Sequence, residues 1–323
     1  MRRALIAAMS ALLAAACGAS SPSHQLRDAS VVLDFTPNAV HAGIYSAIAQ
    51  HLDAAQGVRL HVIVPSASTD SIKLLETGRV DFAILDVHDL AIARGRGADI
   101  VGIMAIVERP LSSVIASSRI STPRALDGQM VGITGVPSDT AVLDSVVAGA
   151  GGDPTRLRTV TIGFNAVADL LAGRVAAATA FWNDEGITLA RSRPGFHVFR
   201  VDSYGAPPYP ELVLCATRTR LRHDPGLARS VVHSLVAGYG FTLAHPARSA
   251  AELEQLVPGL DPKLLRAQLT ALLPAFRGPN GRVGELDPAT LQRWSGWEVR
   301  FGIVKRRPSV AETFDSSLLP PRG

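Results

Sequence analysis

The stretch LDFTPNAVHAGIYSA, residues 33–47, passes from the apolar pattern of a buried strand into the spacing of a helix. Asp34, Phe35, Asn38 and His41 gather in the turn between the two. In an open α/β sheet, ligands bind beyond the carboxyl ends of the strands, where loops and helix N-termini point free amides into a cleft. The stretch therefore predicts one wall of a ligand site.

Apolar runs typical of strands alternate with segments of helical spacing along most of the chain. The runs fall into two groups, 31–35, 59–65, 81–85 and 100–106, followed by 111–117, 130–134, 158–163, 175–180 and 196–201. After residue 218 the pattern is mainly helical. This order predicts an α/β protein with two lobes, each a mainly parallel sheet flanked by helices.

The N-terminus has the pattern of an export signal. MRR precedes a short apolar run, residues 4–16, and Cys17 follows three alanines. The run is too short to span a bilayer permanently. The residues before Cys17 resemble a bacterial lipobox, which implies removal of residues 1–16, a lipid on Cys17, a polar tether over 17–28 and anchoring outside the cytoplasm in the cell envelope. Ordinary secretion with an incidental cysteine is the alternative.

Composition and charge narrow the function classes. The chain is 47% hydrophobic and 19% charged, with a net charge of +4, and its Lys and Arg residues are scattered, which argues against nucleic-acid binding. With Cys17 lipidated, Cys215 is the only other cysteine, so no intramolecular disulfide is expected. The histidines show no i, i+4 pairing and the common hydrolase, metalloprotease and P-loop motifs are absent, so we expect no catalytic residues, metal or cofactor.

Three further loops at predicted strand ends carry side chains suited to ligand binding. They contribute Ser138 and Asp139 in GVPSD, Asn165 beside Phe164 in GFNAV, and Trp182, Asn183 and Glu185 in FWNDE. Structural roles are the alternative, with Ser138, Asp139 and Glu185 capping helices and Trp182 packing in the core. We expect these residues to form the second wall of the cleft.

The sequence LDFTPNAVHAGIY resembles the LDWTPNTNHAGLY signature of substrate-binding proteins for thiamine pyrimidine precursors, which are ABC-importer receptors of the type II periplasmic-binding-protein fold. The similarity continues through 78–97, 132–147, 161–186 and 209–214. It implies a flat heteroaromatic ring stacked on Phe35, with Asp34 and Asn38 hydrogen-bonded to its edge. Strand-end and N-cap bonding is the alternative for Asp34 and Asn38.

The resemblance adds further candidates. His41 and Tyr45 share a helix face and by resemblance line the cleft, although a buried core pair is the alternative. His88 is expected at a helix N-terminus or in the cleft, and Glu211 at the hinge or rim of the cleft. The fold places residues 29–110 and 211–323 in one lobe and 111–210 in the other.

The implied function is that of a monomeric receptor that closes over its ligand and delivers it to permease and ATPase subunits. Hydroxymethylpyrimidine or a formylamino precursor is the expected ligand. Riboflavin is the alternative, because Phe35 in place of Trp, and the small Ala42 and Gly43, would widen the cleft. Sulfonate or nitrate is disfavoured because such anions need arginines where these loops offer carboxylates.

A second alternative is an enzyme. Fungal hydroxymethylpyrimidine phosphate synthases share the fold, and His88 occupies the position of the histidine that they consume. The lysine expected four residues earlier to bind pyridoxal phosphate is Ile84 here, and the cysteine-rich iron-binding run is missing. The sequence therefore favours a receptor over a synthase.

Overall fold

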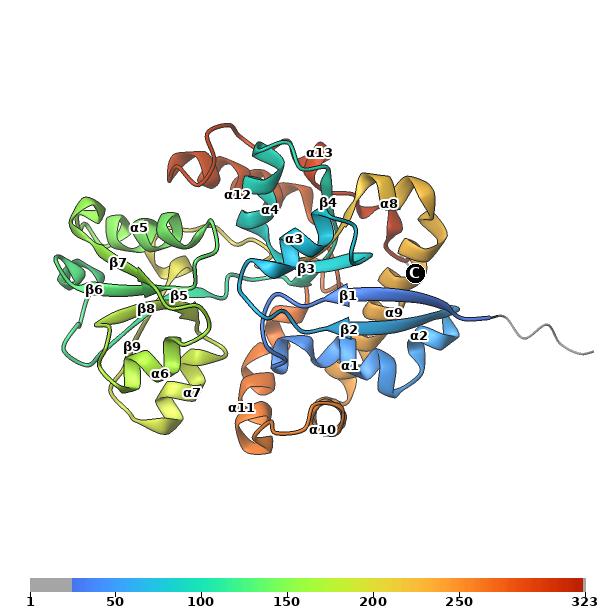
Figure 1. Cartoon of the computed structure of the whole chain (residues 1–323), viewed down its shortest axis with the longest axis horizontal. Helices are drawn as coiled ribbons and strands as arrows, with labels where there is room; N and C mark the ends of the chain where they lie inside the picture. The colour runs from blue at the N-terminus through green and yellow to red at the C-terminus, as the bar shows by residue number, and fades with distance from the viewer. Residues whose placement is uncertain (1–24, 322–323) are drawn as a thin grey trace, which may run out of the picture.

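The computed structural model describes residues 25–321, which form two lobes side by side, each built on a five-stranded sheet (Figure 1). The first-lobe sheet has the order β2 (Val58–Ile63), β1 (Arg27–Val32), β3 (Phe82–Asp86), β10 (Leu212–Thr217) and β4 (Ile100–Val107). The second-lobe sheet has the order β7 (Arg158–Thr161), β6 (Met130–Ile133), β8 (Ala177–Phe181), β5 (Ser112–Ala116) and β9 (His197–Arg200). The predicted signal sequence and Cys17 lie outside the described residues.

Both sheets are mixed, which refines the expectation of mainly parallel sheets. β1 pairs in parallel with β2 and β3, whereas β10 is antiparallel to both β3 and β4. In the second lobe β6 is parallel to β7 and β8, whereas β5 is antiparallel to β8 and β9. The reversed strands, β5 and β10, are those that begin directly after the chain has crossed from the other lobe.

The chain crosses between the lobes at two places. It leaves the first lobe between β4 and β5, and it returns between β9 and β10 through the short helix η4 (Val201–Tyr204). These two segments are the only connections that the described chain makes between the two sheets. A relative movement of the lobes must therefore bend the backbone here.

Helices cover both faces of the first-lobe sheet. Its helices are η1 (Ala39–His41), α1 (Ala42–Ala49), α2 (Leu52–Ala55), α3 (Asp70–Glu76), α4 (Val87–Gly95), α8 (Arg218–His223), α9 (Pro225–Ala244), α10 (Pro246–Leu256), α11 (Pro262–Leu272), η5 (Leu273–Phe276), α12 (Pro288–Arg300), α13 (Val310–Thr313) and η6 (Ser316–Leu318). Helices α1, α9, α10 and α11 pack on one face, with Val31 of β1. Helices α3, α4 and α12 pack on the other, with Val32. Burial on both faces explains the continuous apolar runs.

The second lobe is smaller. It contains η2 (Pro123–Leu126), α5 (Asp139–Gly149), η3 (Pro154–Arg156), α6 (Ala166–Leu171) and α7 (Glu185–Ser192). In Figure 1, α5 lies on one side of the sheet, and α6 and α7 lie on the other. All three helices follow a strand directly, so their N-termini lie at the same edge of the sheet.

The first strand begins earlier than the sequence pattern predicted. β1 starts at Arg27, and Arg27 and Asp28 pair with Val58 and Arg59 of β2. The predicted tether, 17–28, therefore includes two residues that belong to the sheet. Arg27 and Asp28 have exposed polar side chains, and only their backbone takes part in strand pairing. The sequence therefore shows no apolar pattern at these two positions.

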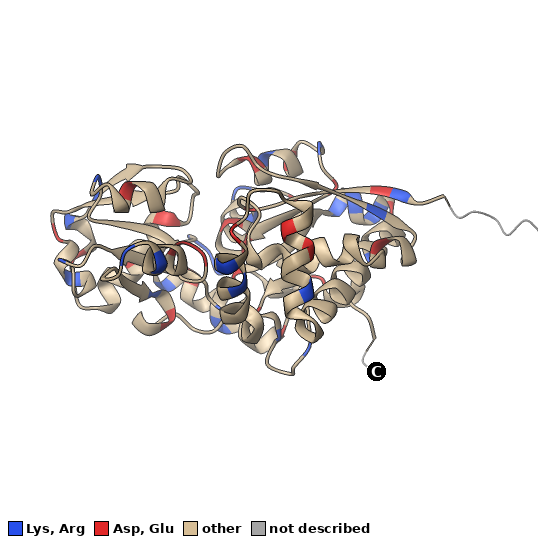
Figure 2. Cartoon of the chain, turned by 90° about the horizontal axis from the view of Figure 1, so that it is seen from below, with Lys and Arg blue, Asp and Glu red and all other residues tan. Residues whose placement is uncertain are grey.

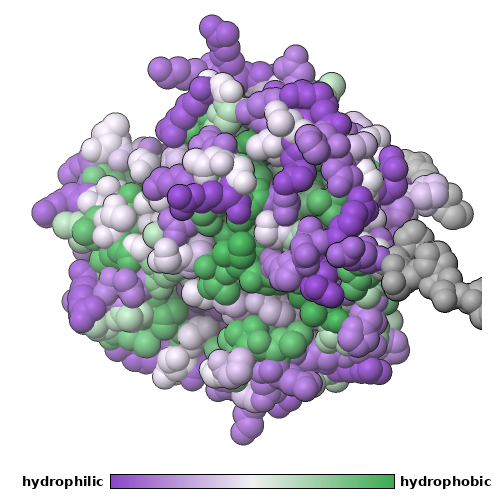
Figure 3. Space-filling model, turned by 45° about the vertical axis from the view of Figure 1, so that its right-hand side comes forward, coloured by the Kyte–Doolittle hydropathy of each residue, from purple (hydrophilic) through white to green (hydrophobic). Residues whose placement is uncertain are grey.

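Charged residues of both signs are distributed over the described part of the chain. Acidic and basic residues are interspersed over both lobes (Figure 2), in line with the argument against nucleic-acid binding. Hydrophilic residues cover much of the face in Figure 3, with apolar areas between them. Among residues 25–321, no helix combines the length and apolar character needed to cross a bilayer.

Helices α1 and α9 cross at unusually short range. A Cβ atom added to Gly238 would lie 2.1 Å from the Gly43 carbonyl oxygen, and one added to Gly43 would meet the ring of Tyr239. The Tyr239 hydroxyl donates to the Val40 carbonyl at 2.8 Å, which ties α9 to η1. The crossing therefore positions the helical end of the 33–47 stretch.

We expect Gly238→Ala to destabilise the fold by about 1–3 kcal/mol, because the added methyl group must push α9 away from α1. Gly240→Ala on the same helix is the control, since a Cβ there meets nothing within 4 Å. The control should be neutral or stabilise by up to about 1 kcal/mol. Urea unfolding measures both changes, and equal free energies for the two variants would contradict the prediction.

Candidate ligand site between the lobes

A cavity of about 120 Å³ lies between the lobes, at the carboxyl ends of the parallel strands. The loops after β1, β2 and β3 line it from the first lobe, and the loops after β6, β7 and β8 line it from the second. The lining residues are Asp34, Phe35, Ser68, Thr69, Ser71, Ile72, Ile84, Leu85, Asp86, Asp89, Ser112, Ser113, Thr134, Val136, Pro137, Ser138, Asp139, Val142, Phe164, Thr179, Ala180, Phe181, Asp184, Glu185 and Leu212. This is the position that open α/β sheets use for ligands.

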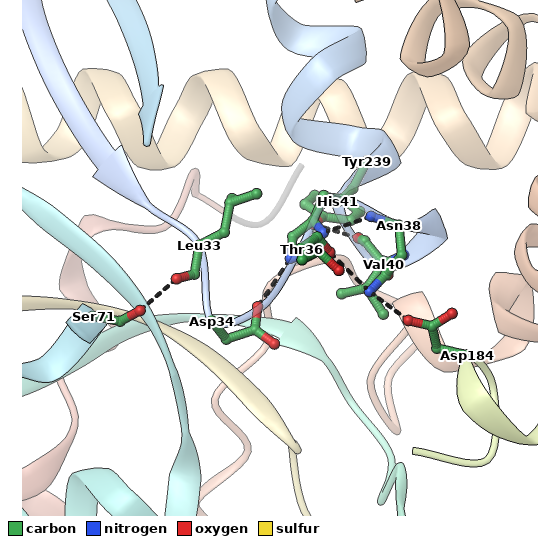
Figure 4. Close-up of polar contacts among 9 residues, drawn as sticks. All are labelled: Leu33, Asp34, Thr36, Asn38, Val40, His41, Ser71, Asp184 and Tyr239. Atoms are coloured by element: carbon green, nitrogen blue, oxygen red, sulfur yellow. Dashed lines mark hydrogen bonds and ion pairs between the residues drawn. The ribbon is translucent and has the colours of Figure 1, made fainter. Parts of the chain in front are cut away.

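Asp34 enters the cavity on the loop after β1 and is oriented from behind by His41 (Figure 4). The His41 Nε2 atom lies 2.9 Å from Asp34 Oδ1. The other ring nitrogen, Nδ1, accepts the Asn38 backbone N–H at 3.2 Å, which leaves the proton on Nε2 to be donated to Asp34. His41 is fully buried and is not among the lining residues, so its contact is with the carboxylate of Asp34.

Asn38 also acts behind the cavity wall. Its Oδ1 accepts the Val40 N–H at 2.8 Å as the N-cap of η1, while its Nδ2 donates to Asp184 Oδ2 in the second lobe at 3.1 Å (Figure 4). Gln268 Nε2 on α11 donates to the other oxygen of Asp184. Two side chains of the first lobe thus hold one carboxyl group of the second.

Other contacts join the two lobes around the same cavity. The Ser138 N–H donates to Asp89 Oδ1 at 3.1 Å. The Ser68 hydroxyl donates to the Thr134 carbonyl at 2.9 Å. Phe35 of the first lobe meets Phe164 of the second edge to face, with ring centroids 4.4 Å apart. The lobes therefore touch on several sides of the cavity.

Asp139 organises the loop between β6 and α5. Its Oδ2 accepts the Thr134 hydroxyl at 2.8 Å and the N–H groups of Gly135 and Val136 at 2.7 and 3.1 Å. Its Oδ1 accepts the Thr179 hydroxyl at 3.0 Å. Asp139 thus lines the cavity, and its structural role is to hold the loop before α5 rather than to cap the helix, which was its alternative.

The cavity is acidic. Its lining contains six carboxyl groups, Asp34, Asp86, Asp89, Asp139, Asp184 and Glu185, and no Lys, Arg or His among the described residues. Burial raises the pKa of Asp184 to about 6 and that of Glu185 to about 8. Burial raises the pKa of Asp89 to about 7 and that of Asp86 well above its usual range. Near neutral pH the cavity therefore combines carboxylic acids, which donate hydrogen bonds, with carboxylates, which accept them.

Trp182 does not line the cavity, contrary to the expectation of a stacking face there. Its Nε1 donates to the Pro110 carbonyl at 3.0 Å, and the Arg200 guanidinium lies 4.4 Å from its ring centroid. Its neighbour Asn183 is fully buried, and both its amide atoms lack a hydrogen-bond partner. Of the FWNDE segment, Phe181, Asp184 and Glu185 line the cavity, whereas Trp182 lies against the segment that joins β4 to β5.

Glu211 is a hinge residue rather than a lining residue. Its fully buried carboxylate accepts the N–H groups of Leu111 and Ser112 and the Ser112 hydroxyl, the last at 2.7 Å. These contacts connect the start of β10 to the start of β5. Glu211 therefore fixes the two crossing segments to each other, which matches the hinge alternative.

His88 lies behind the cavity wall on the first turn of α4. Its Nδ1 contacts Glu298 of α12, and its ring meets the Tyr209 ring edge to face at 4.7 Å. Burial lowers its pKa, but Glu298, Asp86 and Glu211 outweigh burial and raise that pKa to about 10. The side chain is fully buried and does not line the cavity, so of the two expected places His88 takes the helix N-terminus and not the cleft.

Two further candidates lie away from the cavity. Tyr45 is buried in the first-lobe core, where desolvation raises its pKa to about 12, so the core-pair alternative describes it better. Asn165 is exposed, and its Nδ2 donates to the Ile162 carbonyl at 2.9 Å. It holds the turn before α6, while its neighbour Phe164 faces the cavity.

Sequence reasoning missed several lining residues, among them Asp86, Asp89, Phe164 and Asp184. Asp86 directly follows a predicted strand, and Phe164 and Asp184 lie in loops already identified. Treating every residue of the loops at strand ends as a candidate would have found all three. Asp89 lies one turn into α4. Only the approach of α5 from the other lobe brings it to the cavity, and no local signal marks it.

Comparison with known proteins agrees with this architecture. The chain is 27% identical to the formylaminopyrimidine-binding protein of Halalkalibacterium halodurans, over 93% of this chain and 92% of that protein. It is 23% identical to the 4-amino-5-hydroxymethyl-2-methylpyrimidine phosphate synthase of Legionella pneumophila, over 76% of this chain and 79% of that protein.

A solved structure shares the fold. The alkanesulfonate-binding protein SsuA of Xanthomonas axonopodis pv. citri superposes with a TM-score of 0.71 at 16% identity, covering 91% of this chain and 99% of that one. This confirms the predicted periplasmic-binding-protein fold. The family model described as NMT1/THI5 like matches residues 38–249, more than half of the sequence, and the chain therefore belongs to the NMT1/THI5-like family.

Proposed function

We propose that this protein is the substrate-binding receptor of an ABC importer and captures a thiamine pyrimidine precursor, hydroxymethylpyrimidine or its formylamino form. The observation that carries this proposal is the interlobe cavity, with three phenyl rings, six carboxyl groups and no cationic side chain in its described lining. The similarity to a formylaminopyrimidine-binding protein over 93% of the chain supports it.

The carboxyl groups suit the edge of an aminopyrimidine. Such an edge presents an amino N–H beside a ring nitrogen, that is, a donor beside an acceptor. A carboxylic acid offers the complementary pair, an acceptor oxygen beside an O–H donor. Glu185, with a pKa of about 8, holds this proton at neutral pH, while Asp34 receives its orientation from His41. The rings of Phe35 and Phe164 lie at the same cavity and supply apolar contact to a flat ring.

Cavity size favours a single ring over a flavin. The volume of about 120 Å³ is comparable to the roughly 150 Å³ of an engineered protein cavity that holds one benzene molecule. Riboflavin has three fused rings and a ribityl chain, so it would need the lobes to stand farther apart. Sulfonates and nitrate are disfavoured because a buried anion needs donors and positive charge, and this lining is acidic.

A binding function fits the residues better than a synthase function does. One of the relatives is a phosphate synthase, so proteins similar to this chain include an enzyme. In this chain Ile84 stands where the lysine is expected, and Cys215 is the only cysteine among residues 25–321. Cys215 is also buried in the sheet, where desolvation raises its thiol pKa.

The cellular arrangement is part of the same proposal. A signal peptide, residues 1–16, would direct export, and a lipid on Cys17 would hold a monomeric receptor at the outer face of the cell membrane. Residues 29–110 and 211–323 would form one lobe and 111–210 the other. The closed receptor would present its ligand to permease and ATPase subunits.

Calorimetric titration of the chain from Gly18 onward tests the ligand class directly. We expect binding of hydroxymethylpyrimidine or its formylamino derivative, and none of an alkanesulfonate. Binding of riboflavin and of no pyrimidine would instead support the alternative function, a riboflavin-binding receptor. Absence of binding to every pyrimidine and to riboflavin would contradict the proposed ligand.

Phe164→Ala should weaken pyrimidine binding by about 10- to 100-fold, because it removes roughly 1–3 kcal/mol of aromatic and apolar contact. Phe241→Ala is the control, since Phe241 lies on α9 outside the cavity beside Arg248. The same titration measures both variants. Unchanged affinity in Phe164→Ala would exclude contact between its ring and the ligand.

Gln268→Ala should weaken binding by about 10-fold or more, although Gln268 does not line the cavity. The reason is that a hydrogen bond to a charged carboxylate, worth about 1.5–3 kcal/mol, is lost only from the closed form. Stopped-flow fluorescence should locate the effect mainly in faster ligand release. The exposed Gln255→Ala is the control, and equal release rates in the two variants would refute the role of Gln268 in closure.

Pyrimidine affinity should fall as the pH rises above about 8, where Glu185 loses the proton that it donates. Glu185→Gln should flatten this profile because an amide keeps a donor and an acceptor at every pH. The exposed Glu76→Gln should retain the wild-type profile. An identical pH profile in wild type and Glu185→Gln would show that Glu185 does not supply the proton.

A further inference from the structure

Three potential metal ligands converge at the junction of the lobes, next to the cavity. Asp86 ends β3, His88 lies on the first turn of α4 and Glu211 precedes β10. One ligand atom from each residue lies within 4.8 Å of the corresponding atoms of the other two. The lack of i, i+4 spacing among the histidines hid this group, because strand pairing between β3 and β10 brings it together.

The His88 ring is oriented so that one nitrogen remains free. Nδ1 contacts Glu298, and the Trp294 indole N–H lies 3.3 Å from the same nitrogen. The other nitrogen, Nε2, has no hydrogen-bond partner although the side chain is fully buried. A buried polar atom without a partner costs free energy in either protonation state, so something missing from the protein's own contacts should pair with Nε2.

The two carboxylates are held in place by other contacts. Glu211 is oriented by the backbone of Leu111 and Ser112, and Asp86 accepts the His88 N–H at 2.7 Å. The Glu211 contacts lie outside the group, and the contact of Asp86 uses the backbone of His88, so both leave the His88 ring free. The three side chains are thus fixed before any ion binds, which lowers the cost of forming a metal site.

We propose that Asp86, His88 and Glu211 bind a divalent transition-metal ion, for which Zn²⁺ is the best match. Zinc accepts imidazole nitrogen and carboxylate oxygen at about 2.0–2.2 Å, so two of its ligand atoms lie up to about 4.4 Å apart. The observed limit of 4.8 Å requires only a small inward movement. Mg²⁺ and Ca²⁺ prefer oxygen ligands alone, whereas this group contains an imidazole.

Glu298 would act as the outer partner of the site. A metal-binding histidine usually donates its second ring N–H to a carboxylate, and the contact of His88 Nδ1 with Glu298 has this arrangement. Three protein ligands leave a fourth position of a tetrahedral ion for water or for an electron-pair donor of a ligand. Because Asp86 lines the cavity and Glu211 joins the crossing segments, the ion would connect the ligand site to the hinge.

Metal titration of the chain from Gly18 onward, freed of metal by a chelator, tests this site. Calorimetry with Zn²⁺, Mn²⁺ and Mg²⁺ should show one Zn²⁺ per chain, weaker Mn²⁺ binding and no Mg²⁺ binding. Co²⁺ in place of Zn²⁺ should give visible absorption typical of a nitrogen and oxygen site. No stoichiometric Zn²⁺ binding by the natively folded chain would overturn the proposal and leave protons shared between Asp86 and Glu211.

Substitutions at the proposed ligands test where the ion binds. Asp86→Asn and His88→Gln should weaken Zn²⁺ binding by at least about 100-fold, and Glu298→Gln by about 10- to 100-fold. His61→Gln is the control for adventitious binding, since it removes an exposed imidazole that lies 2.7 Å from Asp28. Thermal melting checks folding, and if His88→Gln does not fold, Asp86→Asn decides. Loss of Zn²⁺ binding in His61→Gln with binding retained in Asp86→Asn would refute the site.

Discussion

The buried carboxylate of Glu211 is the contact on which the arrangement of the two lobes depends. It accepts hydrogen bonds from Leu111 and Ser112, and so ties the strand that returns to the first lobe to the strand that enters the second. Because both crossings are joined at this point, the lobes share one pivot, and the cavity lies beside it. Any motion that opens the cavity must turn about these segments.

The cavity beside this pivot is acidic. Strand ends from both sheets face each other, so six carboxyl groups occupy one small volume that contains no cationic side chain among its described lining residues. Burial raises the pKa of Glu185 to about 8, so this group is mainly protonated near neutral pH, while Asp89, with a pKa of about 7, is partly protonated and Asp184, with a pKa of about 6, is mainly ionised. The site can therefore offer donors and acceptors side by side, as an aminopyrimidine requires.

A layer of polar residues behind the lining controls its geometry. His41 orients Asp34, while Asn38 and Gln268 hold Asp184 across the gap between the lobes. Sequence reasoning selected His41 and Asn38 as ligand contacts, and the structure places both one layer further out. Residues of this layer affect binding through the carboxyl groups that they hold and through lobe closure.

The sequence by itself determined the two α/β lobes and the loops that line the cavity, because apolar periodicity and strand-end positions are local properties of the chain. It also placed Asp34, Phe35, Ser138, Asp139 and Glu185 at the cavity. Only the tertiary structure decided that Trp182 faces the hinge, that Asp89 and Gln268 reach the second lobe, and that Asp86, His88 and Glu211 meet. These relations depend on strand pairing and lobe contact between residues far apart in the chain, for which no local pattern exists.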